Sequence, residues 1–382
     1  MSRALAIGAG FIAMASCAPT PDAPVRMPAP DQWTLRLAGE FNIQPLTRFP
    51  APDGPNFGGV SGLVLLPSGR ELLAVCDDGD DPRVYRLAIE GEGPSFRVTP
   101  SEVIRLENPP GAELILDAES LAVTTDGQLL IASEGRGDHE PWRPPALIEF
   151  ALDGKFVRHL EVRSRFTPAV EGPVRRGVRD NAAFESLTIA PGGLRLFTAT
   201  ETALAQDGNM ATLDRGAPAR LLEYVARGGT FEPAREFVYP VEPVGALPFQ
   251  PSFAINGLVD LVALNDTELL ALERSFAQDE ARVGKVTRIR LFRVWLDGAS
   301  DVASVDSLAT AEGVTPVRKR LLLDLGDLAG LSPRLSSLDN FEGLAFGPRL
   351  ADGSASLLLV SDDNFDKTQL TSFLLLRISR TP

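Results

Sequence analysis

A β-hairpin pattern that recurs five times constrains the fold more than any other feature of the sequence. Each copy begins with a pair of small or acidic residues followed by Leu, runs through apolar residues to a turn, and ends a second apolar strand at an acidic residue. The copies begin at Ser61, Glu119, Glu185, Asp260 and Glu342. Their starting points lie 58 to 82 residues apart, which leaves room for about four strands per unit. The sequence therefore predicts an all-β fold, a β-propeller, over residues 33–382.

The number of blades depends on the stretches between the copies. Five copies are clear, and residues 221–251 contain further strand-like sequence that we assign to a degenerate sixth blade. The prediction is a six-bladed ring, which residues 33–41 are expected to close by pairing with the C-terminal blade.

In the second copy, Asp126-Gly127 is typical of a two-residue hairpin turn. A symmetric hairpin centred there places Glu119 opposite Glu134.

Acidic residues stand at matched ends of these hairpins, away from the turns. Because a propeller arranges its inner strands around one axis, these side chains are expected to meet on one face. The predicted catalytic residues are Glu119, Glu185 and Glu342 at the strand starts, with Arg136, Arg274 and the loop residue His139. The predicted metal ligands are Glu134, Glu201, Glu273, Asp362 and Asp363 at the strand ends, with Asn340. Asp77 and Asp78 end the corresponding strand of the first copy.

Carboxylates that share a buried space repel one another and need a positive partner. Ca²⁺ prefers several oxygen ligands in loose geometry, and it is the cofactor that this residue set predicts. Arg136 and Arg274 come shortly after strand-end glutamates and are expected to hold an anionic substrate group. Two structural explanations stay open. The acids are solvated loop charges, or the repeated Glu is a blade-folding motif that accepts backbone N–H groups.

The first 32 residues have the pattern of an export signal and a tether. Arg3 precedes an apolar run over residues 4–14, which is too short to cross a bilayer as a helix. Small residues before Cys17 resemble a lipobox, so residues 1–17 are expected to be a lipoprotein signal peptide, with a plain signal peptide as the alternative. The Pro- and Ala-rich residues 18–32 form the predicted tether. We therefore expect an exported, periplasmic protein that its lipid anchors to the outer membrane.

Charge and motif content exclude several functions. The formal net charge of −14 argues against nucleic acid as a partner, and the expected contact with a membrane is through the N-terminal lipid. The sequence contains no P-loop, dinucleotide-binding glycine pattern, zinc-ligand spacing or EF-hand loop. Ser61 lacks the glycine pattern of a nucleophile elbow. We expect a monomer whose partner is a small anionic ester.

Four short signatures carry a resemblance to a known family. They are Asp117-Ala118-Glu119-Ser120-Leu121, Asn181-Ala182-Ala183-Phe184-Glu185-Ser186-Leu187, Asp339-Asn340-Phe341-Glu342-Gly343-Leu344 and Ser361-Asp362-Asp363-Asn364-Phe365. Through them the chain resembles, over residues 55–379, the bacterial family described as esterase-like activity of phytase. The resemblance implies a phytase-like propeller whose recurring Glu and Asp carry phosphoesterase-like activity. Phytase propellers bind several Ca²⁺ ions and contact phosphate through Lys and Arg, whereas this chain has four Lys.

The hairpins are also similar in pattern to calcium-dependent lactonase propellers, which hold one central metal with Glu, Asn and Asp from different blades. That similarity is an analogy of fold. Three functions remain open at this point. The first is metal-dependent phosphoester hydrolysis at carboxylates on the propeller axis. The others are lactonase-type hydrolysis at the same metal, and non-catalytic binding of a ligand or partner in the cell envelope.

Overall fold

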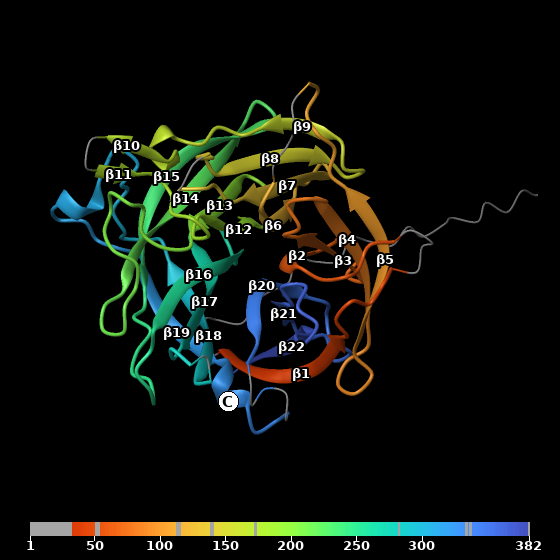
Figure 1. The fold of residues 1–382 in the computed structure, drawn as a ribbon. Helices are drawn as coiled ribbons and strands as arrows, with labels where there is room; N and C mark the ends of the chain where they lie inside the picture. Colours follow the sequence, from red (N-terminus) through yellow and green to blue (C-terminus); the bar gives the residue numbers. More distant parts are fainter. Residues whose placement is uncertain are drawn as a thin grey trace, which may run out of the picture.

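The computed structural model describes residues 33–49, 54–111, 116–137, 141–171, 174–281, 283–332, 335 and 338–380. Within these residues, five four-stranded antiparallel sheets stand as blades around a central axis (Figure 1). The predicted all-β propeller is confirmed. The helical segments of the described residues are short 3₁₀ turns such as Ser164–Phe166, and no helix found there is long and apolar enough to cross a membrane.

The blades are numbered here in chain order, and their strands are given from the axis outward. Blade 1 contains β2 (Val60–Leu65), β3 (Glu71–Cys76), β4 (Arg83–Glu90) and β5 (Arg97–Arg105). Blade 2 contains β6 (Ala118–Val123), β7 (Gln128–Ser133), β8 (Ala146–Ala151) and β9 (Phe156–His159). Blade 3 contains β12 (Phe184–Ile189), β13 (Arg195–Thr200), β14 (Ala217–Arg227) and β15 (Thr230–Val241). A small pair, β10 (Ala169–Glu171) and β11 (Val174–Arg176), precedes blade 3.

The last two blades complete the ring. Blade 4 contains β16 (Phe253–Ala263), β17 (Glu268–Gln278), β18 (Lys285–Trp295) and β19 (Arg318–Asp324). Blade 5 contains β20 (Asn340–Gly347), β21 (Ser356–Asp362), β22 (Thr371–Arg380) and β1 (Trp33–Ile43). β1 pairs with β22 from Trp33 opposite Arg380 to Ile43 opposite Thr371, so the first strand of the chain closes the ring, as predicted.

The predicted sixth blade is wrong for the described residues. The stretch expected to supply it, residues 221–251, contributes most of β14 and all of β15, which are the outer strands of blade 3. These two strands are 11 and 12 residues long, about twice the length of β12 and β13. Because these strands are so long, their sequence was consistent with an additional blade.

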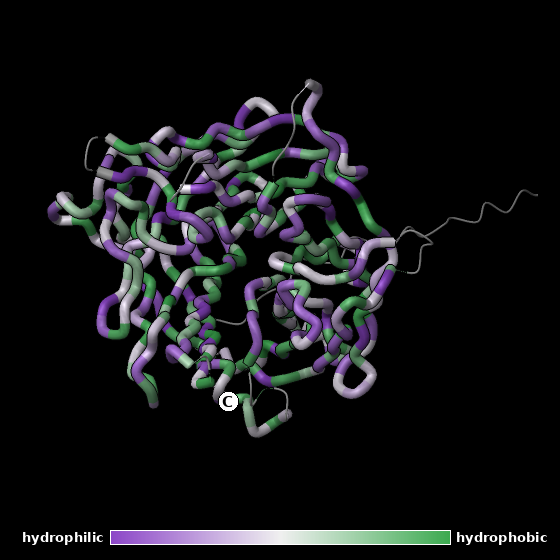
Figure 2. Tube along the Cα trace, viewed as in Figure 1, coloured by the Kyte–Doolittle hydropathy of each residue, from purple (hydrophilic) through white to green (hydrophobic). Residues whose placement is uncertain are grey.

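Apolar side chains pack between neighbouring blades in five separate clusters, one for each interface around the ring. In the interface between blades 1 and 2, for example, Leu73 and Val84 pack with Leu121 and Ile131. Hydrophobic residues follow the strands of every blade in Figure 2. Because both faces of most strands are covered, the blades hold one another in place, and the inner strands β2, β6, β12, β16 and β20 are fixed around the axis.

Candidate functional site

The innermost strand of every blade carries a β-bulge at the same place. In each blade the pairing between the first two strands skips one residue, which has no partner across the strand pair. The skipped residues are Ser61, Glu119, Glu185, Val259 and Glu342. A bulge bends its strand and re-aims a side chain, and bulges are over-represented beside active sites. The three glutamates predicted to be catalytic thus occupy one equivalent position in three blades.

The second strand of each blade supplies another equivalent position beside the bulge. The backbone N–H groups of Asp77, Glu134 and Glu201 bond to the carbonyl groups two residues before the bulge of their blades. The same position belongs to Arg274 in blade 4, opposite Gly257, and to Asp362 in blade 5, opposite Asn340. Four acids and one arginine therefore form a second ring around the axis.

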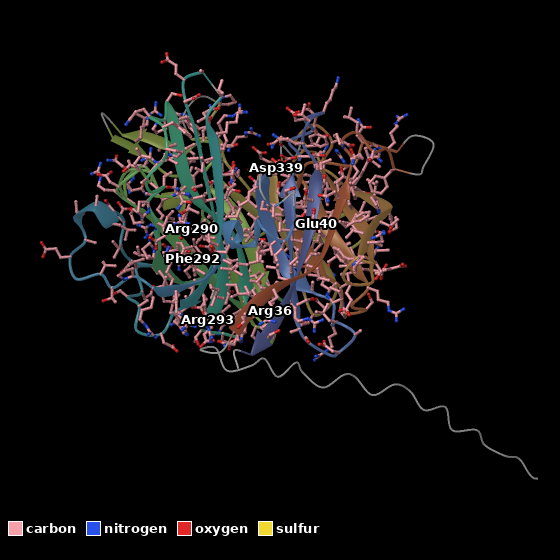
Figure 3. The ribbon with its side chains drawn as sticks, turned by 90° about the horizontal axis from the view of Figure 1, so that it is seen from below. Arg36, Glu40, Arg290, Phe292, Arg293 and Asp339 are labelled. Atoms are coloured by element: carbon pink, nitrogen blue, oxygen red, sulfur yellow. The ribbon has the colours of Figure 1, made fainter. Side chains whose placement is uncertain are left out.

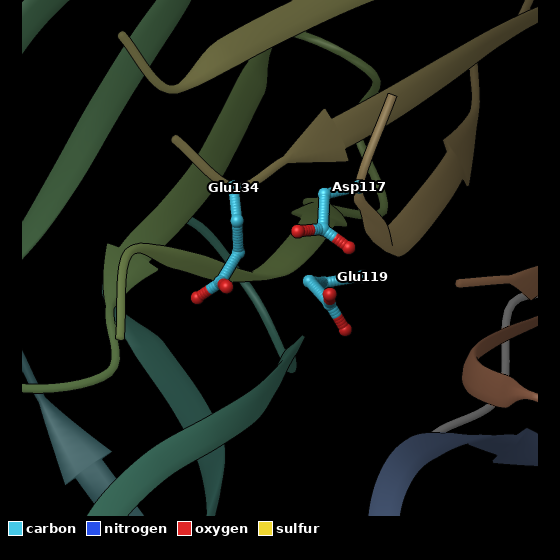
Figure 4. A group of neighbouring side chains, drawn as sticks. All are labelled: Asp117, Glu119 and Glu134. Atoms are coloured by element: carbon cyan, nitrogen blue, oxygen red, sulfur yellow. The ribbon is translucent and has the colours of Figure 1, made fainter. Parts of the chain in front are cut away.

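Blade 2 brings three carboxyl groups within metal-binding distance of one another. Ligand oxygens of Asp117, Glu119 and Glu134 all lie within 4.8 Å of each other (Figure 4). The predicted direct pairing of Glu119 with Glu134 is wrong in detail. The turn has three residues, with Gly127 at φ +84°, and the bulge shifts the register once more, so that Glu134 bonds to the Asp117 backbone.

Electrostatic interactions connect these residues into one group, which we call the carboxylate cluster. It consists of Asp77, Asp117, Glu119, Glu134, Glu185, Glu201, Glu342 and Asp362. Blades 1, 2, 3 and 5 contribute these carboxyl groups, and blade 4 contributes Arg274. Burial, followed by repulsion from Glu185 and Glu342, raises the pKa of Glu119 well above its usual value.

Two hydrogen-bonded carboxyl groups lie at the boundary between blades 2 and 3. Glu134 accepts a 2.7 Å hydrogen bond from the Ala183 N–H. A second hydrogen bond joins the Glu134 and Glu185 side chains, which requires a proton on one of them. Burial, the Glu134 charge and this hydrogen bond raise the pKa of Glu185 well above its usual value. Burial raises the pKa of Glu134 well above its usual value as well, so the pair retains at least one proton.

Two other carboxyl groups of the cluster titrate near neutrality. Burial, with repulsion from Glu342 and Asp117, raises the pKa of Asp77 to about 7. Burial also raises the pKa of Glu201 to about 7, against the lowering effect of Arg274. Burial and the Glu342 charge raise the pKa of Asp362 well above its usual value. The cluster as a whole thus holds protons that a cation of sufficient charge can displace.

Unpartnered oxygens show that the cluster suits a hard cation. Asp77 Oδ1 is buried and accepts no hydrogen bond from the described residues, and Glu201 Oε1 accepts none but lies 3.5 Å from Arg274 Nη2. Oxygen atoms without donors, in a group of eight carboxyl groups, are the ligand type that Ca²⁺ prefers. The residues present therefore fit the predicted cofactor.

A layer of small residues closes the axis behind the cluster. The residues that follow the bulges are Gly62, Ser120, Ser186, Asp260 and Gly343. Asp260 is 2% exposed and accepts hydrogen bonds from the N–H of Leu344 at 2.6 Å and the hydroxyl of Ser120 at 3.4 Å. A Cβ on Gly62 would lie 2.8 Å from the Ser120 Cα, which shows how closely the strands approach there.

Beyond this layer, an apolar cavity of about 300 Å³ is lined by all five inner strands, with residues such as Val64, Val123 and Phe346. The Asp260 layer separates the cavity from the carboxylate cluster. The cluster is therefore reached from the end of the axis where the inner strands begin.

The structure does not bring two predicted metal ligands into the cluster. Glu273 lies one residue before the equivalent position, which Arg274 occupies, and it accepts hydrogen bonds from Tyr239, Asn256 and Lys319. Asp363 accepts hydrogen bonds from the N–H groups of Gly59 and Phe365 and from the Thr371 hydroxyl. Both carboxylates are saturated by protein donors and stabilise the fold.

The remaining predictions have mixed outcomes. Glu134, Glu201 and Asp362 lie in the cluster, and the Asn340 side chain accepts a hydrogen bond from Arg274. Asp78 forms a 2.7 Å ion pair with the buried Arg83. The charge of Arg136 opposes the rise that burial causes in the pKa of Asp117. His139, Cys17 and residues 18–32 lie outside the described residues.

Sequence reasoning missed Asp117 and Arg143, and it placed Asp77 among the acidic strand ends without assigning it to the catalytic or metal-binding residues. Asp117 stands two residues before a bulge, and only the bulge brings it beside Glu134. The Arg143 backbone exchanges hydrogen bonds of 3.0 and 2.8 Å with Arg136, and its charge also acts on Asp117. Arg143 lies between prolines 141 and 144 in a loop without strand pattern, so no sequence signal marked it.

Gly257 makes room for Glu201, and this can be tested by mutation. A Cβ at Gly257 would lie 2.2 Å from Glu201 Oε1 and 2.3 Å from its Cγ. Gly257→Ala is therefore expected to lower the free energy of unfolding by about 1–3 kcal/mol, measured by urea denaturation. Gly192→Ala is the control, because a Cβ there meets nothing within 4 Å. Equal stability of the two variants would contradict this placement of Glu201.

Solved structures with similar folds are distant. The endo-arabinase from Bacteroides thetaiotaomicron is 10% identical over 85% of this chain and 94% of its own, with a TM-score of 0.38. The α-L-arabinanase from Penicillium chrysogenum, complexed with arabinobiose, is 13% identical over 86% and 80%, with a TM-score of 0.36. A luciferin-regenerating enzyme is 11% identical over 84% and 77%, with a TM-score of 0.34. No curated protein matches the chain by sequence.

One family model covers most of the chain. It is named phytase-like, is described as esterase-like activity of phytase, and matches residues 55–365. The match runs from just before blade 1 to the loop after β21, and it contains every residue of the carboxylate cluster together with Arg274. The chain is therefore a member of the phytase-like family.

Proposed function

We propose that the protein is a cation-dependent hydrolase of phosphate esters or related esters and that the carboxylate cluster is its active site. One observation carries the proposal: eight carboxyl groups from four blades converge on the axis, with Arg274 as the cation paired within them. Family membership supports a hydrolytic activity. Such a group is costly to bury unless it binds a cation or retains protons for chemistry.

Asp117, Glu119 and Glu134 would hold the cation, and Ca²⁺ is the candidate that their oxygen atoms favour. A bound divalent cation would polarise the ester oxygen and lower the pKa of a bound water. Glu185 holds a proton beside this trio and can donate it to the leaving group. Asp77 and Glu201, each with a pKa of about 7, are suited to accept a proton from water near neutral pH.

The charge of the site bears on the substrate. Arg274 is engaged with Glu201 and Glu342, whereas Arg136 and Arg143, whose charges act on Asp117, would be the residues that meet an anionic group. A phosphate dianion would face strong repulsion from the remaining carboxylates. This balance favours a monoanionic diester or a carboxylic ester over a dianion, and it keeps lactonase-type hydrolysis as the second candidate.

A substrate panel with controlled cation content tests the proposal. The purified protein is treated with chelator and then assayed with and without Ca²⁺ on a phosphomonoester, a phosphodiester, a carboxylic ester and a lactone. We expect hydrolysis that chelator abolishes and Ca²⁺ restores, and a rise in melting temperature with Ca²⁺. A protein that neither hydrolyses these esters nor gains stability with Ca²⁺ would be a non-catalytic binding propeller instead.

We also propose export and lipid anchoring through Cys17. The strand β1 begins at the end of the molecule opposite the cluster, since Arg36 pairs with Arg377 at the far end of blade 5 from Asp339 (Figure 3). An anchor there would leave the cluster facing away from the membrane. Detergent-phase partitioning that Cys17→Ala abolishes would support this arrangement, and aqueous partitioning of the native protein would contradict it.

A further inference from the structure

Arg274 is the one basic residue among the five equivalent positions beside the bulges. Four blades place a carboxylate beside the bulge, and blade 4 places a guanidinium there. Its bulge residue is also apolar, Val259, where three other blades have Glu. Blade 4 thus contributes a positive charge and no carboxyl group to this end of the axis.

The contacts of Arg274 lie on one side of the cluster. Nη1 forms an ion pair with Glu342 of blade 5 at 3.1 Å and hydrogen-bonds to Asn340, and Nη2 lies 3.5 Å from Glu201 Oε1 of blade 3. The missing side chain at Gly257 leaves the space into which Glu201 extends. Arg274 therefore joins the two blades that flank its own.

Arg274 forms no ion pair on the other side of the cluster. Blade 2 is not adjacent to blade 4, and no ion pair found in the described ranges joins Arg274 to Asp117, Glu119 or Glu134. These three residues are also the group whose oxygen atoms converge within 4.8 Å. Arg274 thus supplies its positive charge near blades 3 and 5, whereas near blade 2 the charges of Arg136 and Arg143 act on Asp117 but form no ion pair with the three carboxyl groups in the described ranges.

We infer that Arg274 is a tethered cation that takes the place of a second metal ion, so that the carboxylate cluster accepts one exchangeable divalent cation and not two. A guanidinium remains charged at all accessible pH values and cannot be removed by a chelator. Its single positive charge offsets part of the negative charge of Glu201 and Glu342 at every accessible pH, and it confines exchangeable binding to the blade 2 trio. The placement of that single ion at the blade 2 trio rests on the proposed function, whereas the role of Arg274 as a fixed cation does not.

Arg274→Gln tests the inference, with Ca²⁺ as the probe. Removing the guanidinium leaves Glu201 and Glu342 buried beside one another without a counter-charge. We expect the Ca²⁺ stoichiometry, measured by isothermal titration calorimetry, to increase from one to two. The melting temperature in chelator should fall by several degrees relative to the native protein, and millimolar Ca²⁺ should remove most of that difference.

Two further variants serve as controls. Glu201→Gln combined with Arg274→Gln deletes one charge of each sign, and it should bind one Ca²⁺ ion. Arg227→Gln removes an exposed arginine that lies 3.6 Å from Glu232. It should change neither the Ca²⁺ stoichiometry nor the dependence of the melting temperature on Ca²⁺.

The outcomes separate the inference from the proposed function. A native protein that binds two Ca²⁺ ions, or an Arg274→Gln variant with unchanged stoichiometry, overturns the inference. Failure of that variant to fold even with Ca²⁺ also overturns it, because a free cation must be able to replace the guanidinium. A native protein that binds no Ca²⁺ beside a variant that binds one supports the inference and contradicts the proposed function.

Discussion

Glu185→Gln is expected to lower the rate of ester hydrolysis by about 100- to 10,000-fold while cation affinity stays close to that of the native protein. The Glu185 carboxyl group retains a proton because it is buried and hydrogen-bonded to Glu134. A glutamine amide can still donate a hydrogen bond to Glu134, so the trio with Asp117 and Glu119 keeps its geometry. The amide cannot deliver a proton to a leaving group, and kcat should carry the loss.

Two variants complete this experiment. Glu119→Gln removes an oxygen ligand from the trio and should lose both Ca²⁺ binding and activity. Glu273→Gln changes a buried carboxylate of blade 4 that lies outside the cluster, so it should reduce stability and leave Ca²⁺ affinity unchanged. Steady-state kinetics and calorimetry on the three variants give the answer. Native-like turnover of Glu185→Gln would exclude Glu185 as the proton donor.

The hairpin repeats predicted the architecture because they record the two inner strands of each blade. Their acidic termini also predicted most of the cluster, since Glu119, Glu185, Glu342, Glu134, Glu201 and Asp362 all lie in it. The outer strands carry no repeated signal, and long β14 and β15 were therefore read as an additional blade. The repeat therefore predicted only the two inner strands of each blade.

The pairing register of the inner strands could not be predicted from the sequence. A bulge adds one residue to the inner strand without any marker residue, and in blade 2 a three-residue turn adds a further shift. Together they change the residue opposite Glu134 from Glu119 to Asp117. In blade 4 the bulge residue is Val259, so the acidic pattern pointed to Glu273 although Arg274 holds the equivalent position. A single-residue shift turns a side chain to the other face of a strand.

The cation-free protein is expected to lose stability as the pH rises from about 4 to about 7. The folded state holds protons on Asp77 and Glu201 up to a pKa of about 7, whereas the same groups in the unfolded chain release them near 3.8 and 4.5. Between these limits the folded state binds more protons than the unfolded state. The free energy of unfolding therefore falls with rising pH, by about 1.4 kcal/mol per pH unit for each such carboxyl group.

Calcium should offset part of this loss. The ion binds the ionised cluster, so its affinity increases over the same pH range and its binding releases protons. Urea unfolding at pH 5, 6, 7 and 8, with chelator or with 1 mM Ca²⁺ (about a hundredfold excess over a 10 µM dissociation constant), should show stabilisation that grows to about 2.7 kcal/mol at the upper end. The double variant Asp77→Asn with Glu201→Gln is the matched control, because it lacks both titrating groups and should lose most of the slope seen in chelator. A cation-free native protein whose stability rises between pH 4 and pH 7 would contradict the raised pKa values of these two carboxyl groups.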